Sequence, residues 1–274
     1  MSLPAVELAC LAILALGLLL RARAPGFGAW RRDALPVFVG AWIGEQSCIS
    51  LYRFYTYADG WHARLGDVPL LVPVIWIFVL LSARDVAQAL TKPHAKPGTW
   101  LPLAFAVVWY DASLIEPVAT HSGLWRWHEA GPMQVPWIGM LGWACYGAAA
   151  LGWLAWRPLQ EKPLQRLLAV AVLAPLTTHG LLLLAWWGLL RHVGRSAPQA
   201  QTVAVAAWLL ALGLTVAVVR SRRLPLALVL PRVAPALFFF GLLAVTAAPL
   251  PLWAMAGSFA LPWLAATRWT PARA

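Results

Sequence analysis

Residues 200–219 read AQTVAVAAWLLALGLTVAVV and contain no charged side chain. A helix of this length crosses the roughly 30 Å hydrocarbon core of a bilayer. Comparable apolar runs recur along the 274 residues, of which 61% are hydrophobic and 11% are charged. Soluble proteins average about 25% charged residues, so the composition excludes an ordinary soluble domain. The sequence therefore predicts an all-α, polytopic transmembrane helical bundle.

The apolar runs predict about eight spans, with seven to nine allowed. The last stretch is too long for one simple helix and contains Pro249 and Pro251. A kinked helix, two short helices or a re-entrant pair is therefore expected there. Neither an internal repeat nor a low-complexity linker is present, which favours a single integral membrane domain over residues 1–274. The expected spans are residues 3–20, 34–51, 68–83, 100–117, 134–156, 165–190, 200–219 and 234–266.

Basic residues between the spans predict the orientation of the chain. The first, third, fifth and seventh connections hold 14 Lys and Arg residues, against five in the second, fourth and sixth. The positive-inside rule then places the odd connections in the cytoplasm and the N-terminus outside, in a multi-pass protein of the cell (inner) membrane. The odd connections carry Arg21, Arg23, Arg31, Arg32, Arg84, Lys92, Lys96, Arg157, Lys162, Arg166, Arg220, Arg222, Arg223 and Arg232. The even connections carry Arg53, Arg64, Arg126, Arg191 and Arg195.

Several kinds of chemistry are excluded by what the sequence lacks. The formal net charge of +11 does not indicate nucleic-acid binding, because the basic residues are spread between the spans rather than gathered in one patch. The three cysteines are isolated and the six histidines have no ligand spacing, so no metal site is expected. No P-loop or GxGxxG motif is present, which argues against nucleotide chemistry. No cofactor is expected.

The acidic residues are distributed unevenly along the chain. All ten Asp and Glu residues lie at or before Glu161. Any chemistry is therefore expected within the first 161 residues. The active-site portion is expected at about residues 40–155, and the helices over residues 165–266 are expected to be scaffold.

Three acids fall inside predicted spans: Glu45 in the second, and Asp111 and Glu116 in the fourth. An ionisable group there is costly and usually faces a cavity or the bundle interior, where it has either a functional role or only a packing role. Asp111 and Glu116 lie about 140° apart around an ideal helix. Glu116 immediately precedes Pro117, where the helix is expected to end or bend. In the predicted orientation all three acids lie in the outer halves of their spans.

Acids surrounded by aromatic residues favour one type of chemistry. Desolvation allows a buried carboxyl group to hold a proton at neutral pH and donate it. Aromatic faces stabilise a nearby cation by roughly 0.5–2 kcal/mol each. Such a pocket suits protonation of an alkene followed by capture of the carbocation.

Two stretches carry a resemblance to a known family. They are FYTYADGWHARLGDVPLLVPVIW at residues 54–76 and WYDASLIEPVATHSGLWRW at residues 109–127. Both resemble segments of the bacterial and archaeal carotenoid hydratases, the CruF-type and bisanhydrobacterioruberin-hydratase-like membrane proteins. The resemblance covers about residues 40–155. Glu116 departs from it, because an aspartate is expected more often at that position.

The resemblance implies addition of water across the terminal isopropylidene double bond of a carotenoid end group, which gives a tertiary alcohol without a cofactor. It implies Asp111 or Glu116 as the general acid, with Glu45 or the other acid orienting or deprotonating water. The expected partners are a lipophilic carotenoid and membrane lipid. The candidate substrate-binding residues are Tyr55, Tyr57, Asp59, Trp125, Trp127 and Trp42.

Three alternatives use the same residues differently. A carotenoid cyclase or isomerase would keep the acid-and-aromatic pocket and exclude water. A proton-coupled transporter would use Glu45 and Asp111 as relay carboxyls. A structural membrane protein would hold the acids as satisfied packing groups. The one-sided distribution of acids and the lack of a repeat count against a transporter.

Overall fold

The computed structural model describes residues 2–24, 26–92, 94–129, 131–156, 162–193, 199–220 and 224–266. Five charged residues used above to predict orientation or to locate the acids lie outside these ranges: Arg157, Glu161, Arg195, Arg222 and Arg223.

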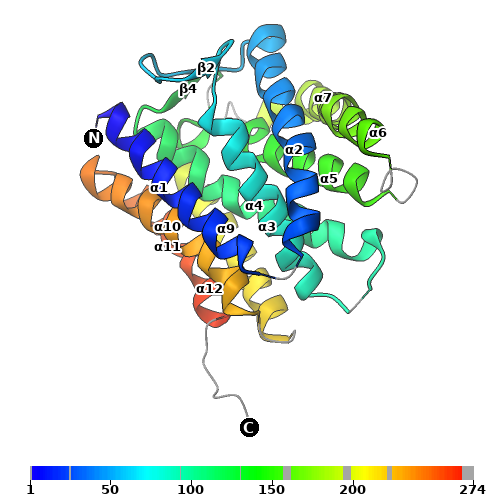
Figure 1. Ribbon diagram of the computed structural model, residues 1–274. Helices are drawn as coiled ribbons and strands as arrows, with labels where there is room; N and C mark the ends of the chain where they lie inside the picture. The colour runs from blue at the N-terminus through cyan, green and yellow to red at the C-terminus, as the bar shows by residue number, and fades with distance from the viewer. Residues whose placement is uncertain are drawn as a thin grey trace.

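Long apolar helices make up most of the described chain, and eight of them are long and apolar enough to cross a membrane (Figure 1). The prediction of an all-α bundle with about eight spans is therefore confirmed. Helices dominate because the bilayer core contains no water to bond free backbone groups. The helices are α1 (Leu3–Ala22), α2 (Phe27–Ser47), α3 (Leu71–Ala89), α4 (Pro97–His121), α5 (Trp137–Ala155), α6 (Pro163–Leu168), α7 (Ala174–Ala185), α8 (Arg191–Val193), α9 (Gln199–Arg220), α10 (Leu226–Val245), α11 (Leu250–Ser258) and α12 (Ala260–Ala266).

Short π-helical turns join or extend some of these helices. Residues 48–52 continue α2 to Tyr52, and residues 169–173 connect α6 to α7 within one span. Residues 186–190 connect α7 to α8. The sixth predicted span, 165–190, thus corresponds to one apolar stretch, Pro163–Leu190.

The C-terminal helices differ from the expected last span of 234–266. Helix α10 begins at Leu226 and ends at Val245, and two short helices, α11 and α12, follow a turn. Pro249 and Pro251 lie at the start of α11. Backbone N–H groups in the first turn of a helix have no intrahelical acceptor, so a proline there costs no hydrogen bond. Arg232 lies inside α10, so its assignment to the seventh connection is wrong. A basic residue at the edge of an apolar run looks like a loop residue that sets membrane orientation unless its ion-pair partner is known.

Helix α4 does not end at Pro117, one of the two outcomes expected there. It continues to His121, although the proline has no N–H to donate to the preceding turn. Val118 and Ala119 are fully buried, so packing of this last turn offsets the lost hydrogen bond.

In the described part of the chain, four short strands form two antiparallel pairs beside the bundle (Figure 1). Strand β1 (Tyr55–Tyr57) pairs with β4 (Trp125–Trp127), which joins the loop after α2 to the loop after α4. Strands β2 (Arg64–Leu65) and β3 (Val68–Pro69) form a small hairpin. Gly66 lies in its turn with φ 63°, and a Cβ there would meet Gln46 Oε1 at 2.4 Å. The turn therefore requires glycine for its conformation and for its close packing.

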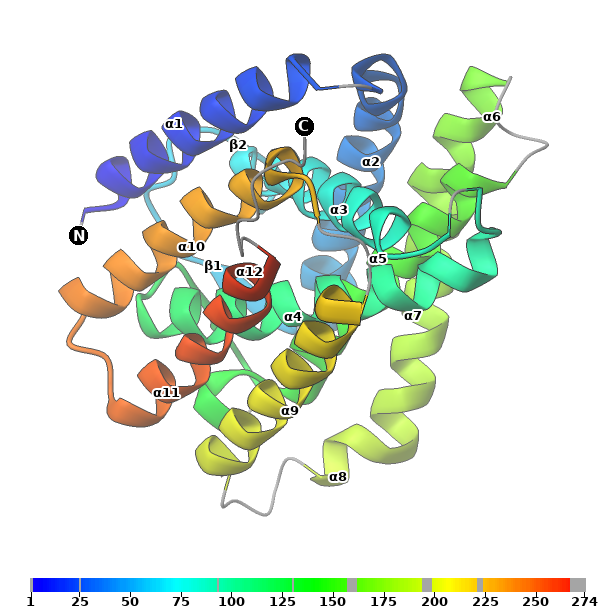
Figure 2. The same ribbon diagram turned by 90° about the horizontal axis from the view of Figure 1, so that it is seen from below.

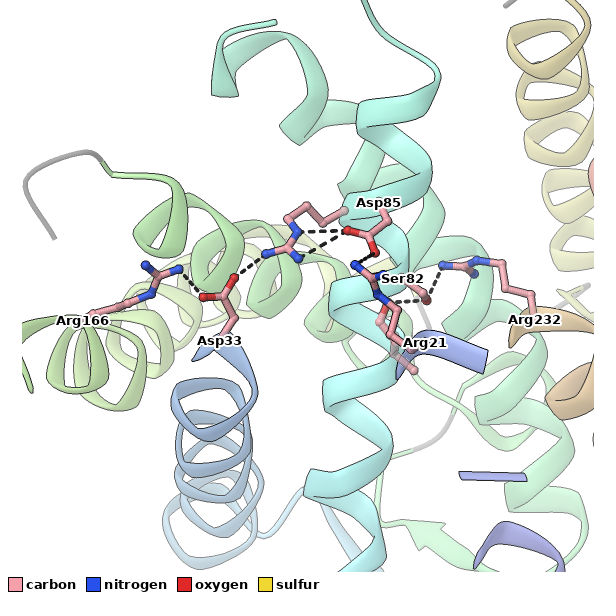
Figure 3. Close-up of polar contacts among 8 residues, drawn as sticks. Arg21, Asp33, Ser82, Asp85, Arg166 and Arg232 are labelled. Atoms are coloured by element: carbon pink, nitrogen blue, oxygen red, sulfur yellow. Dashed lines mark hydrogen bonds and ion pairs between the residues drawn. The ribbon is translucent and has the colours of Figure 1, made fainter. Parts of the chain in front are cut away.

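A cluster of ion pairs joins four helices near the start of α2 (Figure 3). Asp33 of α2 is 2% exposed and accepts hydrogen bonds from Arg84 of α3, at 2.5 Å, and from Arg166 of α6. Arg84 also donates to Asp85, which pairs with Arg21 of α1 at 3.4 Å. Arg84 and Arg166 thus lie within helices and not in the loops to which the orientation count assigned them. The cluster therefore links these helices at the N-terminal end of α2, whereas the strands follow its C-terminal end.

Asp33→Asn is expected to destabilise the protein by about 3 kcal/mol, because two largely buried guanidinium groups lose their shared carboxylate. The effect should be at the lower end of the range for broken buried pairs, since Arg84 keeps Asp85 as a partner. Thermal unfolding of the detergent-purified protein measures this, with Asp59→Asn as the matched exposed control. Equal unfolding midpoints for the two variants would contradict the stabilising role of Asp33.

Candidate active site

Glu45 is a buried carboxylate near the C-terminal end of α2, 9% exposed. It accepts three hydrogen bonds from aromatic side chains. The hydroxyls of Tyr55 and Tyr57 donate to Oε2, the latter at 2.8 Å, and the Trp76 indole donates to Oε1 at 2.8 Å. No cation among the described residues pairs with Glu45, which is unusual for a carboxyl group at this depth.

Glu116 is a second buried carboxylate, 3% exposed, in the last turns of α4. It also accepts three hydrogen bonds, all from indole N–H groups. Trp125 and Trp127 donate to Oε2 at 2.9 and 2.8 Å, and Trp143 of α5 donates to Oε1 at 2.7 Å. The two glutamates therefore have parallel surroundings built from different aromatic residues.

The strand pair and two helices hold the two sets of donors against each other. In the β1–β4 register Tyr55 lies opposite Trp127 and Tyr57 lies opposite Trp125. The ring centroids of these pairs are 4.7 and 5.9 Å apart. The third donors form another such pair, because the rings of Trp76 and Trp143 are 4.3 Å apart. Each donor to Glu45 is thus in ring contact with a donor to Glu116, and the two carboxyl groups belong to one site.

The ring contacts between the two sets of donors bring the two carboxyl groups into one buried region. Burial and the nearby carboxylates, Glu45 first and then Glu116, raise the pKa of Tyr57 well above its usual value. The Tyr57 hydroxyl therefore keeps its proton and remains a donor. Two like charges in one dry site disfavour simultaneous ionisation, so one of the two carboxyl groups is suited to hold a proton.

The types of donor distinguish the two glutamates. An indole N–H can only donate, whereas a tyrosine hydroxyl donates or accepts by rotating. Protonated Glu45 could donate its own O–H to a tyrosine oxygen, but protonated Glu116 would direct its O–H at groups that cannot accept. The surroundings therefore favour the proton on Glu45 and the negative charge on Glu116.

Both glutamates line a mostly apolar cavity of about 210 Å³ inside the bundle. Its walls come from α1, α2, α3, α4, α5, α7 and α10, together with the loop that holds β1 and the strand β4. Buried carboxyl groups converging in an apolar pocket are the usual arrangement of a small-molecule site. Helices beyond residue 165, predicted as scaffold, contribute part of this wall.

Asp111 also lines the cavity but has a different partner. The Arg232 guanidinium of α10 donates to its carboxylate at 2.5 Å and to the Ser82 hydroxyl of α3 at 3.1 Å. Arg232 also lies over the Trp263 ring, 4.8 Å from its centroid. Asp111 is thus neutralised by a permanent cation, unlike either glutamate.

Comparison with known proteins identifies the family of the chain. Residues 6–209 match a family model described as carotenoid biosynthesis protein. The chain belongs to the carotenoid biosynthesis protein family. The match contains Glu45, Asp111 and Glu116 and ends before Arg232. No curated protein and no solved structure matches the chain.

The fold brings most of the predicted site residues together. The three acids and Tyr55, Tyr57, Trp125 and Trp127 all line the cavity. Two others are placed elsewhere. Trp42 donates its indole N–H to the Leu65 carbonyl at 3.0 Å, and Asp59 lies exposed on the loop after β1. Neither is among the residues lining the cavity.

Sequence reasoning missed three residues of this family member's site. Trp76 lies in the stretch that carried the resemblance, so a signal for it existed. Trp143 is one of 18 tryptophans, and Arg232 was counted as a loop charge, so nothing local distinguished either. Among the described residues, no group of three or more His, Cys, Asp or Glu side chains is arranged to hold a metal ion.

Proposed function

We propose that this protein hydrates the terminal carbon–carbon double bond of a carotenoid end group and produces a tertiary alcohol. The observation that carries the proposal is the pair of buried carboxyl groups, each held by three aromatic donors, in an apolar cavity. Membership of the carotenoid biosynthesis family supports the substrate class. The two glutamates supply an acid and a base, and the aromatic rings supply faces for a cation.

In the proposed reaction, Glu45 donates its proton to the CH carbon of the isopropylidene double bond. The π electrons form the new C–H bond, and the neighbouring carbon becomes a tertiary cation. The rings around the pair and the ionised Glu116 stabilise that cation. Water then adds through an oxygen lone pair while Glu116 accepts its proton. The proton returns to Glu45, so one water molecule is added and the protein is unchanged.

This assignment differs from the sequence-based expectation that Asp111 or Glu116 is the general acid. A carboxylate paired with a buried guanidinium is held in its ionised form, which makes Asp111 a poor proton donor. Glu116 faces donor-only indoles, which favours its use as the base. Glu45 is the remaining acid, and its tyrosine partners tolerate both protonation states.

The proposal is tested by pigment mass spectrometry in carotenoid-producing cells with and without this chain. A product heavier by one water, with oxygen derived from isotopically labelled water, is the expected result. The control is the same host carrying the Glu45→Gln/Glu116→Gln double variant. An isobaric product that forms with the wild-type chain and not with this variant would instead indicate a cyclase or isomerase and overturn the hydration proposal.

A further inference from the structure

The cavity extends from the glutamate pair along two sides that differ in chemistry. One side lies between α1, α3 and α10, three helices that contact one another. Figures 1 and 2 both show α1 and α10 running side by side at the edge of the bundle. The other side lies against α7, which packs on α2 and α5.

The side between α1, α3 and α10 is long and apolar. Along α1 its wall runs from Val6 to Gly17, a rise of about 16 Å. Gly17 permits close packing there, because a Cβ would meet Phe78 Cε1 at 2.9 Å. The rings of Phe78, Phe238 and Phe239 also line this side. Apart from the Cys10 thiol and the Trp76 indole, which donates to Glu45, the lining residues that α1, α3 and α10 contribute are apolar until the wall reaches Ser82 and Arg232.

The α7 side is more polar. Thr178 and His179 line it, and the His179 Nε2 lies 2.7 Å from the Ser47 hydroxyl. Ser47 is two residues from Glu45 on the same span. Thr178 donates to the Ala174 carbonyl and His179 pairs with Ser47, but each side chain keeps further hydrogen-bonding capacity with which it can hold a water molecule.

We propose that the side between α1, α3 and α10 binds the polyene that continues from the carotenoid end group, and that water approaches the glutamates from the α7 side. The identity of the ligand rests on the proposed function. A polyene interacts with a protein only through dispersion contacts and the burial of apolar area. The apolar wall between α1, α3 and α10 matches such a ligand, whereas a polar wall does not. The two reactants then meet at the glutamate pair from opposite directions, so water need not cross the region that the polyene fills.

The outer surfaces of the same helices fit entry of a lipid-soluble chain. Leu8 and Leu11 of α1 and Leu237 of α10 are 70%, 53% and 66% exposed, respectively. Such leucines on membrane-spanning helices contact lipid tails. A carotenoid dissolved in the bilayer thus encounters α1 and α10 directly. The Asp111–Arg232 pair and Ser82 mark where the apolar wall gives way to polar groups.

The test compares tryptophan substitutions on two faces of α1. Ile13 lines the cavity, whereas Leu11 is exposed on the same helix. Ile13→Trp should fill the proposed polyene site, and Leu11→Trp is the matched control. Ala236→Phe fills the same space from α10, and Leu182→Trp fills the α7 side. Each detergent-purified variant is titrated with lycopene, and binding is followed by the visible circular dichroism that an ordered polyene acquires.

Ile13→Trp and Ala236→Phe are expected to weaken lycopene binding at least about tenfold, because the larger side chains occupy space that the polyene needs and must be displaced before it binds. Leu11→Trp and Leu182→Trp are expected to bind like the wild type. Loss of binding in Leu182→Trp, wild-type binding in both Ile13→Trp and Ala236→Phe, or no lycopene binding by the wild-type protein would overturn the assignment.

Binding and chemistry are separated by a second substrate. Citronellol carries an isopropylidene end and no polyene. If Ile13→Trp loses lycopene hydration but retains citronellol hydration at the wild-type rate, the polyene site is supported. If the wild-type protein binds lycopene with the expected pattern among the variants but hydrates neither compound, the proposed function fails and the polyene site stands.

Discussion

Glu116→Gln is expected to reduce hydration by about 10²–10⁴-fold, the usual contribution of a positioned acid or base. The amide cannot accept the proton of water, and it removes the negative charge facing the cation. Its NH₂ group would also meet indole N–H donors that cannot accept a hydrogen bond. Glu116→Gln should therefore lose stability as well as activity.

Glu45→Gln is expected to lose hydration to a similar extent but to keep more of its stability. Two of the three partners of Glu45 are tyrosine hydroxyls, which can rotate to accept from the new amide. Product formation is measured by pigment mass spectrometry and stability by thermal unfolding. Glu129→Gln, at an exposed site, is the matched control. Wild-type hydration in either of the two buried variants would remove that glutamate from the mechanism.

Asp111→Asn is expected to destabilise the protein by about 3–5 kcal/mol, because Arg232 would remain buried without its counter-charge. Replacing both partners, as in Asp111→Asn/Arg232→Met, should recover much of this loss, since a buried pair exchanged for neutral groups is often close to neutral. A double-mutant cycle of unfolding free energies measures the coupling between the two residues.

The same double variant decides between a structural and a catalytic role for Asp111. If Asp111 only holds α10 against α4, the folded double variant should retain hydration within about tenfold of the wild type, since only packing near the cavity changes. A stable double variant that loses hydration as completely as Glu116→Gln would make Asp111 the proton donor. That outcome would contradict the assignment of Glu45.

The helical fold and the acidic residues of the site could be predicted from the sequence. Apolar runs long enough to cross a bilayer admit few structures other than helices, because each span must satisfy its own backbone hydrogen bonds. The acids were recognisable for a related reason. Glu45, Asp111 and Glu116 are costly within such spans, so their presence marks a cavity or a buried partner.

Their partners could not be predicted in the same way. Trp143 completes the donor set of Glu116, yet it does not differ locally from the other tryptophans of the spans. Trp76 lies in a stretch that carries the family resemblance, but that resemblance does not identify it as a partner of Glu45. Arg232 lies at the edge of an apolar run, where a basic residue usually sets membrane orientation. It instead pairs with Asp111, which lies 121 residues earlier in the sequence. The continuation of α4 beyond Pro117 likewise depends on burial of its last turn.

The sequence alone determined the membrane-spanning character, the number of spans and the acids within them, because bilayer thickness and the cost of buried charge act on each segment separately. Tertiary structure decided which groups meet: three aromatic donors at Glu45, three at Glu116 and a guanidinium at Asp111. These contacts depend on how helices rotate and pack and on the β1–β4 register. Hydropathy does not encode them, because contacts between helices form only when distant segments pack together.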